Sequence, residues 1–398
     1  YSHSRGRVVT VPQDDVLLPG LTPLEMLSFA AELRLRGSDK ATRKQCVLSV
    51  LRRLQLADDE IAQRIGSVEE RGLSGGQRKR VSIGVELIGS PRALLVDEPT
   101  SGLDAKTALD VVRLLKSLCR DGIGPTVIAS IHQPSWRVFR EFGEAVLLAR
   151  GAVAYSGRTD AVMGHFEGLG FVCPPNENPA DYFLVLLQDE LEARGCDFVQ
   201  SWRVAEDERA VPAAAAAAAA DASPPSKRPR QRAEGVSSYR VGICKQVWVL
   251  LRRRLYDQVQ DPSKFGRQLL LKIMVGLLVG IIWLNEGRSE SFTSIFPTIG
   301  SLFLIVNNSS LDVLLDTVLH FPLSRALLKR EYNNGMFSVF AFWLSTTLSN
   351  LMLCTLNALL LALPVFFLVG FTLTWTTFGI FVATLTLMSL IGGALGVV

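Results

Sequence analysis

The chain has 398 residues, of which 20% are charged and 48% are hydrophobic, and its formal net charge is +4. The charges are unevenly distributed, because the last 132 residues hold only 11 of them and the final 67 hold none. Average soluble domains are about a quarter charged. This distribution therefore excludes a wholly soluble protein, and the long apolar runs exclude a disordered one. The small net charge does not provide the excess of Lys and Arg that binding to nucleic-acid phosphates needs, so no nucleic-acid partner is expected.

The two ends and the cysteines say little about the class of protein. Residue 1 is Tyr and Val398 lies inside an apolar run, so both ends are expected to be truncated. The six cysteines are at least 23 residues apart and show no zinc-type spacing. We therefore interpret them as free thiols.

Residues 1–187 have the pattern of an α/β domain. Short apolar runs at 8–11, 93–96 and 126–131 are typical of buried strands, and apolar residues recur at helical spacing between the last two runs. Alternation of strand, helix and strand predicts a largely parallel sheet with helices packed on it.

Two connecting regions follow the α/β domain. Residues 188–236 contain eight consecutive alanines and then prolines among basic residues, so they are expected to form a disordered linker. Residues 237–266 are expected to form an amphipathic connecting helix that ends in a cluster of Lys and Arg. Basic residues beside a membrane segment favour its cytoplasmic side and the anionic lipid headgroups there.

Residues 267–398 are expected to form an all-α polytopic transmembrane domain. A span needs about 20 apolar residues, and the sequence predicts about four spans, at 269–284, 296–318, 337–368 and 378–398. The third is expected to kink near Pro364. The start of the domain and the loop after the second span are basic, which places both on the cytoplasmic side.

The second predicted span is unusually polar. Asn307 and Ser310 would line a substrate pathway if they lie at membrane depth, where polar side chains tend to face other helices or a cavity. Alternatively, the span ends early and leaves Asp312 and Asp316 at the cytoplasmic interface. We favour the interface for the two aspartates, and the role of Asn307 stays open.

The first motif is LSGGQ at residues 73–77. Ser74, Gly75, Gly76 and Gln77 open a helix with apolar periodicity, so several backbone N–H groups and the positive end of the helix dipole are available to bind a phosphate. A helix that Ser74 merely caps would have the same sequence, so this motif does not decide between the two interpretations.

The second motif follows the predicted strand at 93–96 and begins with two acids, Asp97 and Glu98. Carboxylates at the end of a parallel strand lie at the ligand-binding edge of the sheet, and adjacent side chains point to opposite faces. Asp97 is therefore a candidate ligand of Mg²⁺, and Glu98 is a candidate to orient or deprotonate an attacking water.

Two further residues follow other predicted strands. His132 comes directly after the strand at 126–131, where it could contact a γ-phosphate. Gln13 follows the strand at 8–11, and its amide is a candidate to bind Mg²⁺ or to position a water.

Together, these motifs closely resemble the ATPase domain of ABC transporters over residues 1–187. LSGGQ (73–77) is similar to the family signature, LLVDEPTSGLD (94–104) to the Walker B strand and D-loop, His132 to the switch histidine and Gln13 to the Q-loop glutamine. The chain also resembles the white-like G subfamily of half-transporters. This resemblance is carried by the segments VSIGVEL, SIHQPS and NPADYFLVLL and by the order of the domains, with the ATPase domain ahead of the spans. The implied fold is an α/β ABC-type nucleotide-binding domain of the P-loop NTPase-like class, followed by an all-α transmembrane domain.

The resemblance implies a role for each motif residue. Two ATPase domains would bind ATP between them, and Ser74, Gly75, Gly76 and Gln77 would contact the nucleotide of the partner. The other implied roles are Mg²⁺ binding by Asp97 and Gln13, general base for Glu98, γ-phosphate sensing by His132, and coupling of the two sites by Asp104.

One departure from the family pattern is large. No G-x-x-x-x-G-K-[ST] phosphate loop occurs in the sequence, although the family has one ahead of the Q-loop, and only 12 residues precede Gln13. A truncated N-terminus is the expected explanation. A C-terminus that stops after fewer spans than the subfamily has would agree with truncation.

Two functions are compatible with these residues. The first is one half of an ATP-driven exporter, an ABC-type ATPase that is active only with the missing phosphate loop and a dimer partner, identical or different. The second is a non-catalytic half-transporter that completes the ATP site of its partner. We favour the first, because an abandoned site would have little reason to keep Glu98 and His132. The resemblance also implies an apolar or amphipathic cargo, such as a lipid or sterol, and a multi-pass membrane protein with a cytoplasmic ATPase domain.

Overall fold

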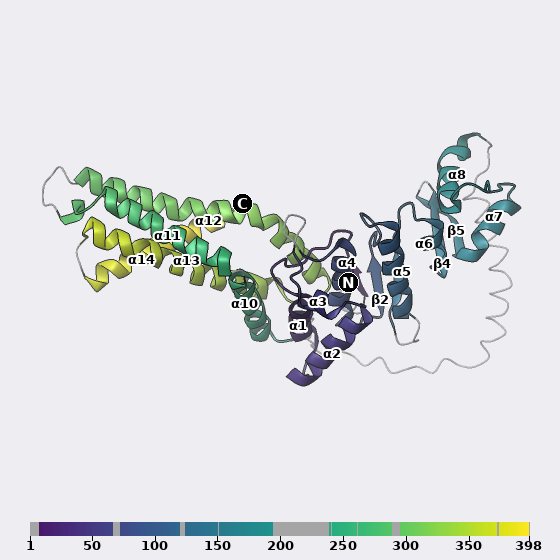
Figure 1. Ribbon diagram of the computed structural model, residues 1–398, viewed down its shortest axis with the longest axis horizontal. Helices are drawn as coiled ribbons and strands as arrows, with labels where there is room; N and C mark the ends of the chain where they lie inside the picture. The colour runs from purple at the N-terminus through teal and green to yellow at the C-terminus, as the bar shows by residue number, and fades with distance from the viewer. Residues whose placement is uncertain are drawn as a thin grey trace.

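The computed structural model describes most of the chain, namely residues 8–66, 72–119, 124–149, 151–193, 239, 241–260, 262–288, 295–371 and 374–397. Figure 1 shows an elongated molecule with a bundle of long helices at one end and the α/β elements at the other.

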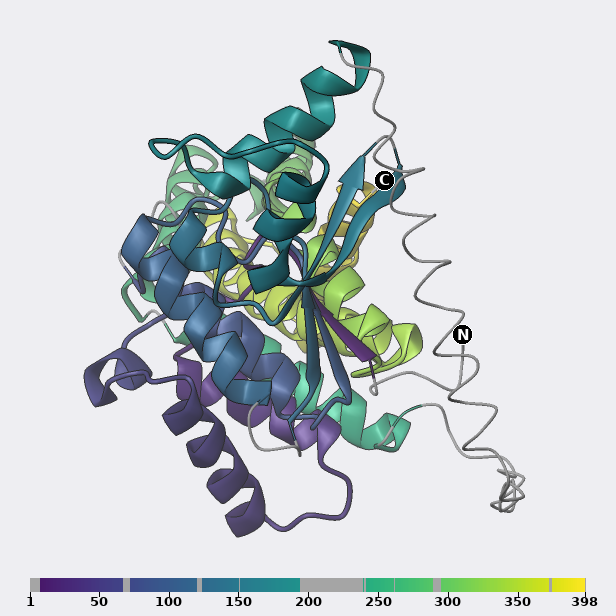
Figure 2. The same cartoon turned by 90° about the vertical axis from the view of Figure 1, so that its right-hand side faces the viewer.

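Three parallel strands form the sheet that the sequence predicts. They are β1 (Val8–Val11), β2 (Ala93–Val96) and β3 (Thr126–Ala129), and β2 lies between the other two (Figure 2). The register pairs Val9 with Leu94, so the carboxyl ends of neighbouring strands meet at one edge of the sheet. This edge positions the loops that follow each strand.

Helices pack on and beside this sheet. They are α1 (Pro23–Arg34), α2 (Lys40–Arg53), α3 (Asp58–Ala62), α4 (Gly75–Leu87) and α5 (Ala105–Cys119). The helix α4 contacts β1, and α5 contacts β3. Their buried aliphatic side chains form one hydrophobic core with β1 and β2, and this core holds the carboxyl edge in place.

A second group of α/β elements follows β3. It consists of α6 (Trp136–Phe139), β4 (Glu144–Ala149), β5 (Ala152–Arg158), η1 (Thr159–Ala161), α7 (Val162–Gly168) and α8 (Pro179–Ala193). The strands β4 and β5 form an antiparallel hairpin, and Phe166 stacks on Phe183 in a separate core. The helix α8 continues past the predicted boundary at residue 187, and most of the predicted linker lies outside the described residues.

The remaining elements are helical. They are α10 (Ile243–Val259), α11 (Pro262–Ile282), η2 (Glu286–Arg288), α12 (Ile295–Asn333), α13 (Val339–Val369) and α14 (Trp375–Leu395). In the described part of the chain, four helices, α11 to α14, are long and apolar enough to cross a membrane. The helix α10 packs against α13, between the bundle and the α/β elements (Figure 1).

The second membrane helix differs most from its predicted span. The helix α12 continues through Asp312 and Asp316 to Asn333, and its candidate span runs from Ile295 to Pro322. The helix therefore does not end ahead of the two aspartates, and their place at the cytoplasmic interface stays a prediction. The part of α12 beyond Pro322 carries most of the charged residues of this helix and extends toward the α/β elements.

Local chemistry explains the boundary between α13 and α14. The helix α13 continues on both sides of Pro364 and ends at Gly370, whose φ of 81° is a left-handed conformation that glycine adopts easily. The next helix begins where the Thr374 hydroxyl accepts a hydrogen bond from the N–H of Thr377. Thr374 is thus the N-terminal cap of α14.

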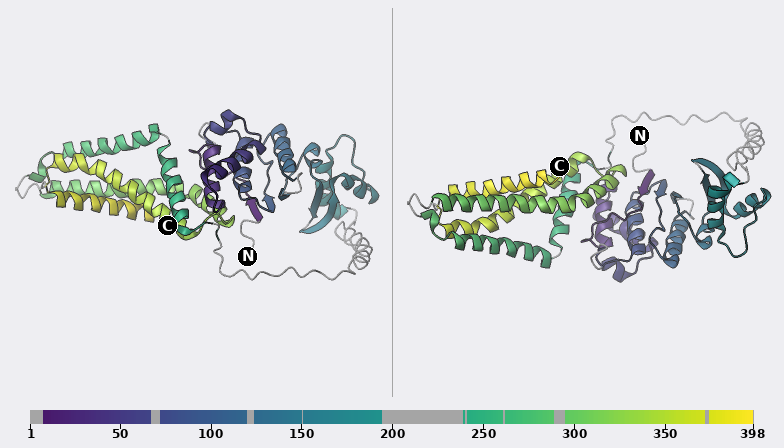
Figure 3. Two further views of the ribbon diagram at one scale, coloured as in Figure 1. Left: turned by 90° about the horizontal axis from the view of Figure 1, so that it is seen from below. Right: turned by 90° about the horizontal axis from the view of Figure 1, so that it is seen from above.

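Small residues let the membrane helices pack in pairs. The helix α11 packs along α13, and α12 packs along α14 (Figure 3). A Cβ on Gly276 would lie 2.6 Å from the Pro364 ring, and a Cβ on Gly392 would overlap the carbonyl oxygen of Ser310. Only glycine permits these approaches, as is common between membrane helices.

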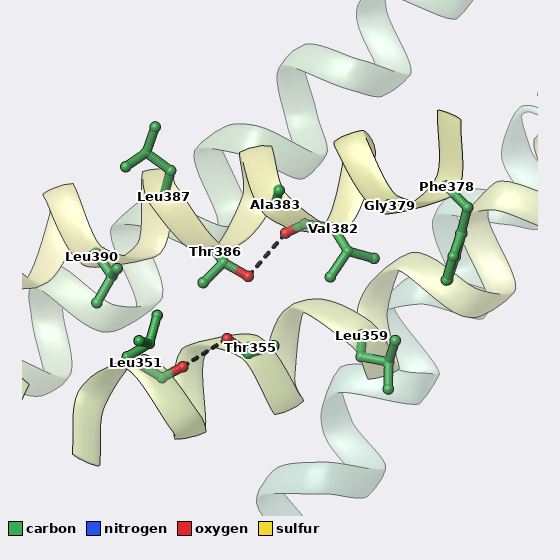
Figure 4. A pocket seen from close by; sticks show the side chains of 10 residues that line it. All are labelled: Leu351, Thr355, Leu359, Phe378, Gly379, Val382, Ala383, Thr386, Leu387 and Leu390. Carbon is green, nitrogen blue, oxygen red and sulfur yellow. Dashed lines mark hydrogen bonds between the residues drawn. The ribbon is translucent and has the colours of Figure 1, made fainter. Parts of the chain in front are cut away.

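An apolar groove of about 560 Å³ lies between α13 and α14 (Figure 4). Two threonines line it, but Thr355 donates to the carbonyl oxygen of Leu351 and Thr386 donates to that of Val382. Because both hydroxyl donors are satisfied within their own helices, the lining is apolar in its chemistry.

A buried ion pair joins α10 to the end of α12. Arg253 donates to both carboxylate oxygens of Glu331 at 2.6 and 2.8 Å, and the two side chains are only 6% and 1% exposed. Beside it, Arg252 pairs with Glu32, and Arg254 donates to a hydroxyl of α13. The sequence suggested that this basic cluster faces lipid headgroups, but these three arginines bind to the protein itself.

Replacing Arg253 by Met should destabilise the protein strongly, because Glu331 would stay buried without its partner. Removing one member of a buried pair costs about 3–5 kcal/mol, so the thermal unfolding temperature of the full-length protein in detergent should fall clearly. Arg158→Met breaks the exposed pair with Asp160 and is the matched control, with little change expected. Equal effects of the two substitutions would contradict the structural role of the buried pair.

Candidate functional site

The carboxyl edge of the sheet brings two of the predicted site residues into direct contact. Gln13 follows β1, and its Nε2 donates to Oε2 of Glu98 at 2.8 Å and to the hydroxyl of Ser101 at 3.3 Å. Glu98 follows β2 and has a φ of 39°, which is uncommon for a residue other than glycine. Backbone held in such a conformation is often found at functional sites.

Asp97 and Glu98 are joined through Ser130, which follows β3. The Ser130 hydroxyl donates to Oδ1 of Asp97 at 2.5 Å and accepts a hydrogen bond from the N–H of Glu98 at 3.0 Å. One hydroxyl therefore links the ends of β2 and β3 and orients both acids. The sequence reasoning gave no role to Ser130 or Ser101. The strand predicted at 126–131 includes Ser130, but β3 ends at Ala129 and its residues are exposed or half-buried, so Ser130 lies just beyond the strand.

His132 lies two residues beyond Ser130, and its side chain is exposed. Within the described part of the chain, no hydrogen bond or ion pair connects it to Gln13, Asp97 or Glu98. The structure thus places His132 past the end of β3, as predicted, but outside the hydrogen-bonded cluster.

The LSGGQ segment forms the start of α4. The Ser74 hydroxyl accepts from the N–H of Gln77 at 3.4 Å, and Oε1 of Gln77 accepts from the N–H of Ser74 at 2.6 Å. This capping box orders the end of the helix. The cap is thus present, and it is compatible with phosphate binding by the remaining N–H groups of the first turn.

Gly76 lies against the first turn of α5. A Cβ at this position would overlap Cγ2 of Thr107, whereas a Cβ on Gly75 would lie 3.2 Å from the end of the Leu103 side chain. The second glycine of the motif is therefore required for packing, whatever ligand the loop binds.

Asp104 caps the N-terminus of α5. Its Oδ1 accepts hydrogen bonds from the N–H groups of Lys106 and Thr107, both at 3.1 Å. Hydrogen bonds from Thr107, and then from Lys106, lower the pKa of this carboxyl below its ordinary value. Asp104 is therefore charged at neutral pH, and its role in coupling two ATP sites stays a prediction.

Lys79 connects α4 to the loop that holds Gln13. Its Nζ donates to the carbonyl oxygen of Gln13 at 2.7 Å and lies 3.0 Å from Oδ1 of Asp15. Burial raises the pKa of Asp15, and the charge of Lys79 opposes that rise. The sequence reasoning missed Lys79, although a lysine among the apolar residues of a predicted helix was visible.

The far end of α4 is held by two arginines. Glu86 is fully buried and pairs with Arg34 of α1 and, at 3.2 Å, with Arg330 of α12. Arg330 also donates to the carbonyl oxygens of Val16 and Ser82 at 2.7 and 3.0 Å. The helix that begins at LSGGQ is therefore bonded at its other end to a membrane helix.

A second contact connects α12 to the first strand. Asn334 donates to the carbonyl oxygen of Thr10 and accepts from the N–H of Thr10, both at 2.9 Å. Met336 and Phe337 then enter the core of the α/β domain. Because β1 leads to Gln13, the loop after α12 contacts the strand that positions this residue.

Family models match the chain in three places. An ABC transporter model matches residues 1–101, an ABC-2 type transporter model matches residues 245–398, and a second ABC-2 type transporter model matches residues 132–200. ABC transporter G family member 8 of Arabidopsis thaliana is 32% identical, with 96% of this chain and 60% of that protein covered. The chain thus combines an ABC transporter domain with an ABC-2 type transporter domain, and it is similar to members of the ABC transporter G family.

Other proteins are also similar to this chain. The broad substrate specificity ATP-binding cassette transporter ABCG2 of Rattus norvegicus is 29% identical, with 98% of this chain and 61% of that protein covered. A solved dimeric ATP-binding cassette, bound to ADP and Pi, is 29% identical and matches with a TM-score of 0.33, covering 40% of this chain and 65% of that chain. The chain spans between about half and two thirds of the length of the curated relatives.

The ABC-2 type transporter match indicates that the helical part lies in a membrane. The predicted architecture, an ABC-type α/β domain followed by a helical transmembrane domain, is confirmed. The chain is a multi-pass integral membrane protein with its ATPase domain on the cytoplasmic side. The end of α12 near Asn333 is therefore its cytoplasmic end.

Replacing Gly76 by Ala should weaken the contact between α4 and α5, because the new methyl group would overlap the methyl group of Thr107. Overpacking costs about 1–3 kcal/mol, so the thermal unfolding temperature of the full-length protein should fall. Adding Thr107→Ser removes the opposing methyl group and should restore most of the loss. Gly75→Ala is the control, since the Leu103 side chain can yield. If Thr107→Ser gave no rescue, the steric explanation would be wrong.

Proposed function

We propose that the protein is one half of an ATP-hydrolysing exporter that moves a lipid, a sterol or another amphipathic compound, and that it works as a dimer with an identical or different half-transporter. The observation that carries this proposal is the helix α4. It begins with the signature residues and ends at Glu86, which pairs with Arg330 of the membrane helix α12. A displacement of α4 would therefore be transmitted to α12.

The site residues divide the work of hydrolysis in this proposal. Glu98 accepts a proton from the attacking water, and Gln13 holds the Glu98 carboxylate in place. His132 contacts the γ-phosphate from the end of β3. The residues that bind the nucleotide of the partner half are Ser74, Gly75, Gly76 and Gln77. Asp104, at the start of α5, couples the two sites across the dimer.

The donor set of the carboxyl edge fits Mg²⁺ shared with nucleotide phosphates. Asp97 offers a carboxylate, Gln13 an amide oxygen and Ser101 a hydroxyl, all of which are oxygen donors. The described residues contain no group of three or more His, Cys, Asp or Glu that would bind a metal by itself. Mg²⁺ is usually held by one or two carboxylates together with phosphates and waters. The ion would neutralise charge that develops on the transferred phosphoryl group.

Two connections carry motion from the ATPase domain to the membrane. The first is Glu86–Arg330, about 18 Å along α4 from Ser74 at 1.5 Å per residue. The second is Asn334–Thr10, on the strand that leads to Gln13. Both converge on the cytoplasmic end of α12, so movements of the signature helix and of the Gln13 strand would act on one membrane helix.

The alternative is a non-catalytic half that completes the site of its partner. It is motivated by the sequence, which contains no G-x-x-x-x-G-K-[ST] motif in its 398 residues. The contact between Gln13 and Glu98 favours the catalytic function, because it keeps a general base in place.

Replacing Glu98 by Gln in the full-length dimer, reconstituted in lipid nanodiscs, should reduce ATP hydrolysis by about 100-fold or more, because general base catalysis contributes about 10²–10⁴-fold. Phosphate release measures the rate. Glu144→Gln alters an exposed glutamate of β4 and serves as the matched control, with a rate equal to that of the wild type. Hydrolysis that is measurable in the wild type and unchanged by Glu98→Gln would favour the non-catalytic alternative.

A further inference from the structure

A charged pair lies within the membrane-spanning helices, separate from the nucleotide site. Lys272 of α11 and Asp312 of α12 form an ion pair with 2.6 Å between Nζ and Oδ2. Lys272 lies seven residues past Phe265, where its candidate span begins, and Asp312 lies ten residues ahead of Pro322, where its own span ends. At 1.5 Å per residue, the two charges lie about 10 and 15 Å along their helices from these ends. Ionisable residues within membrane-spanning helices are costly and usually functional.

Helix packing does not account for this pair. The helix α11 packs along α13, and α12 packs along α14. Among the described helices, Lys272 and Asp312 therefore connect two that do not pack along each other. An ion pair that only stabilised helix packing would be expected between helices that are in close contact. The helices α11 and α13 make such a contact at Gly276.

The two charges differ in accessibility. Lys272 is 12% exposed and already donates to Oδ2 of Asp312, whereas Asp312 is 52% exposed. Its other oxygen, Oδ1, accepts no hydrogen bond from the described residues. A ligand can therefore reach the carboxylate and not the ammonium group, which favours a cation.

The neighbours of Asp312 on α12 suit a cation that also has an apolar part. Leu311 and Leu315 are 54% and 58% exposed and provide apolar surface beside the carboxylate. The groove between α13 and α14 has an apolar lining with no charged group (Figure 4).

We propose that Asp312, held by Lys272, binds the ammonium group of a cationic amphipathic compound whose apolar part lies against Leu311 and Leu315. This inference rests on the proposed export function and narrows its cargo from amphipathic compounds in general to cations. An exposed carboxylate backed by a buried lysine forms a local dipole whose negative end faces the ligand, so anions of similar shape are disfavoured.

Binding of two fluorescent probes to the full-length dimer in nanodiscs tests this site. The probes are a dansyl-labelled alkylammonium and a dansyl-labelled alkanoate of equal chain length. No nucleotide is added, so an inactive ATPase would leave the result unaffected. The wild type should bind the cation about tenfold more tightly than the anion, the ratio expected of a charge-assisted hydrogen bond. Asp312→Asn should remove this preference.

The charge-swapped protein, Lys272→Asp with Asp312→Lys, gives the sharper result. It keeps a complete pair but places the ammonium group at the accessible position, so its preference should reverse to the alkanoate. The swap remains informative even if Asp312→Asn leaves Lys272 unpaired and fails to fold. Asp160→Asn makes the same change outside the membrane and should bind both probes as the wild type does.

Two outcomes would overturn the proposed cation site. One is equal binding of both probes by the wild type, and the other is an unchanged preference after the swap. Normal probe preference together with absent ATP hydrolysis would instead count against the export function alone.

Discussion

A buried charge needs a partner, and this requirement determines how the ATPase domain meets the membrane helices. Glu86 and Glu331 are almost completely buried, and each is paired with an arginine from another helix, Arg330 and Arg253 respectively. Neither acid could remain ionised in an apolar junction without its partner. The helix α12 supplies a base and an acid at adjacent positions, and they bind in different directions, toward α4 and toward α10. The ends of these three helices therefore have one arrangement that satisfies every charge.

This junction makes α12 the element on which events in the ATPase domain converge. Separating a buried pair costs about 3–5 kcal/mol, so α4 and α12 are expected to move together and not to slide past each other. The same end of α12 leads into Asn334, which binds the strand ahead of Gln13. The helix that begins at LSGGQ and the strand ahead of Gln13 are thus attached to the same membrane helix. A transporter needs such a connection, because hydrolysis must change the membrane domain to move a cargo.

The sequence predicted those parts of the site that depend on position along a strand. Asp97 and Gln13 follow apolar runs, and parallel strands bring their ends to one edge, so their proximity follows from a local pattern. The sequence could not predict contacts between polar residues that are distant from each other in the chain. Lys79 and Ser130 bind residues that the periodicity of the sequence does not reveal as partners. Arg253 binds Glu331, which is 78 positions away in the chain. The place of the α12 aspartates at the cytoplasmic interface stays a prediction, because polarity marks a helix end as readily as a buried site.

The requirement that a buried charge has a partner also distinguishes the ion pairs at the ATPase–membrane junction from the pair Lys272–Asp312. At the junction both members of each pair are buried, as expected where charges fix the contact between helices. In the pair between the membrane helices, the Lys272 side chain is 12% exposed and the Asp312 side chain is 52% exposed, so the carboxylate is the more accessible of the two charges. A pair selected for helix packing alone gains nothing from leaving its carboxylate open, since a fully enclosed pair would exclude water and bind more strongly. The asymmetry of Lys272 and Asp312 is therefore better explained by a ligand that approaches the open side than by helix assembly.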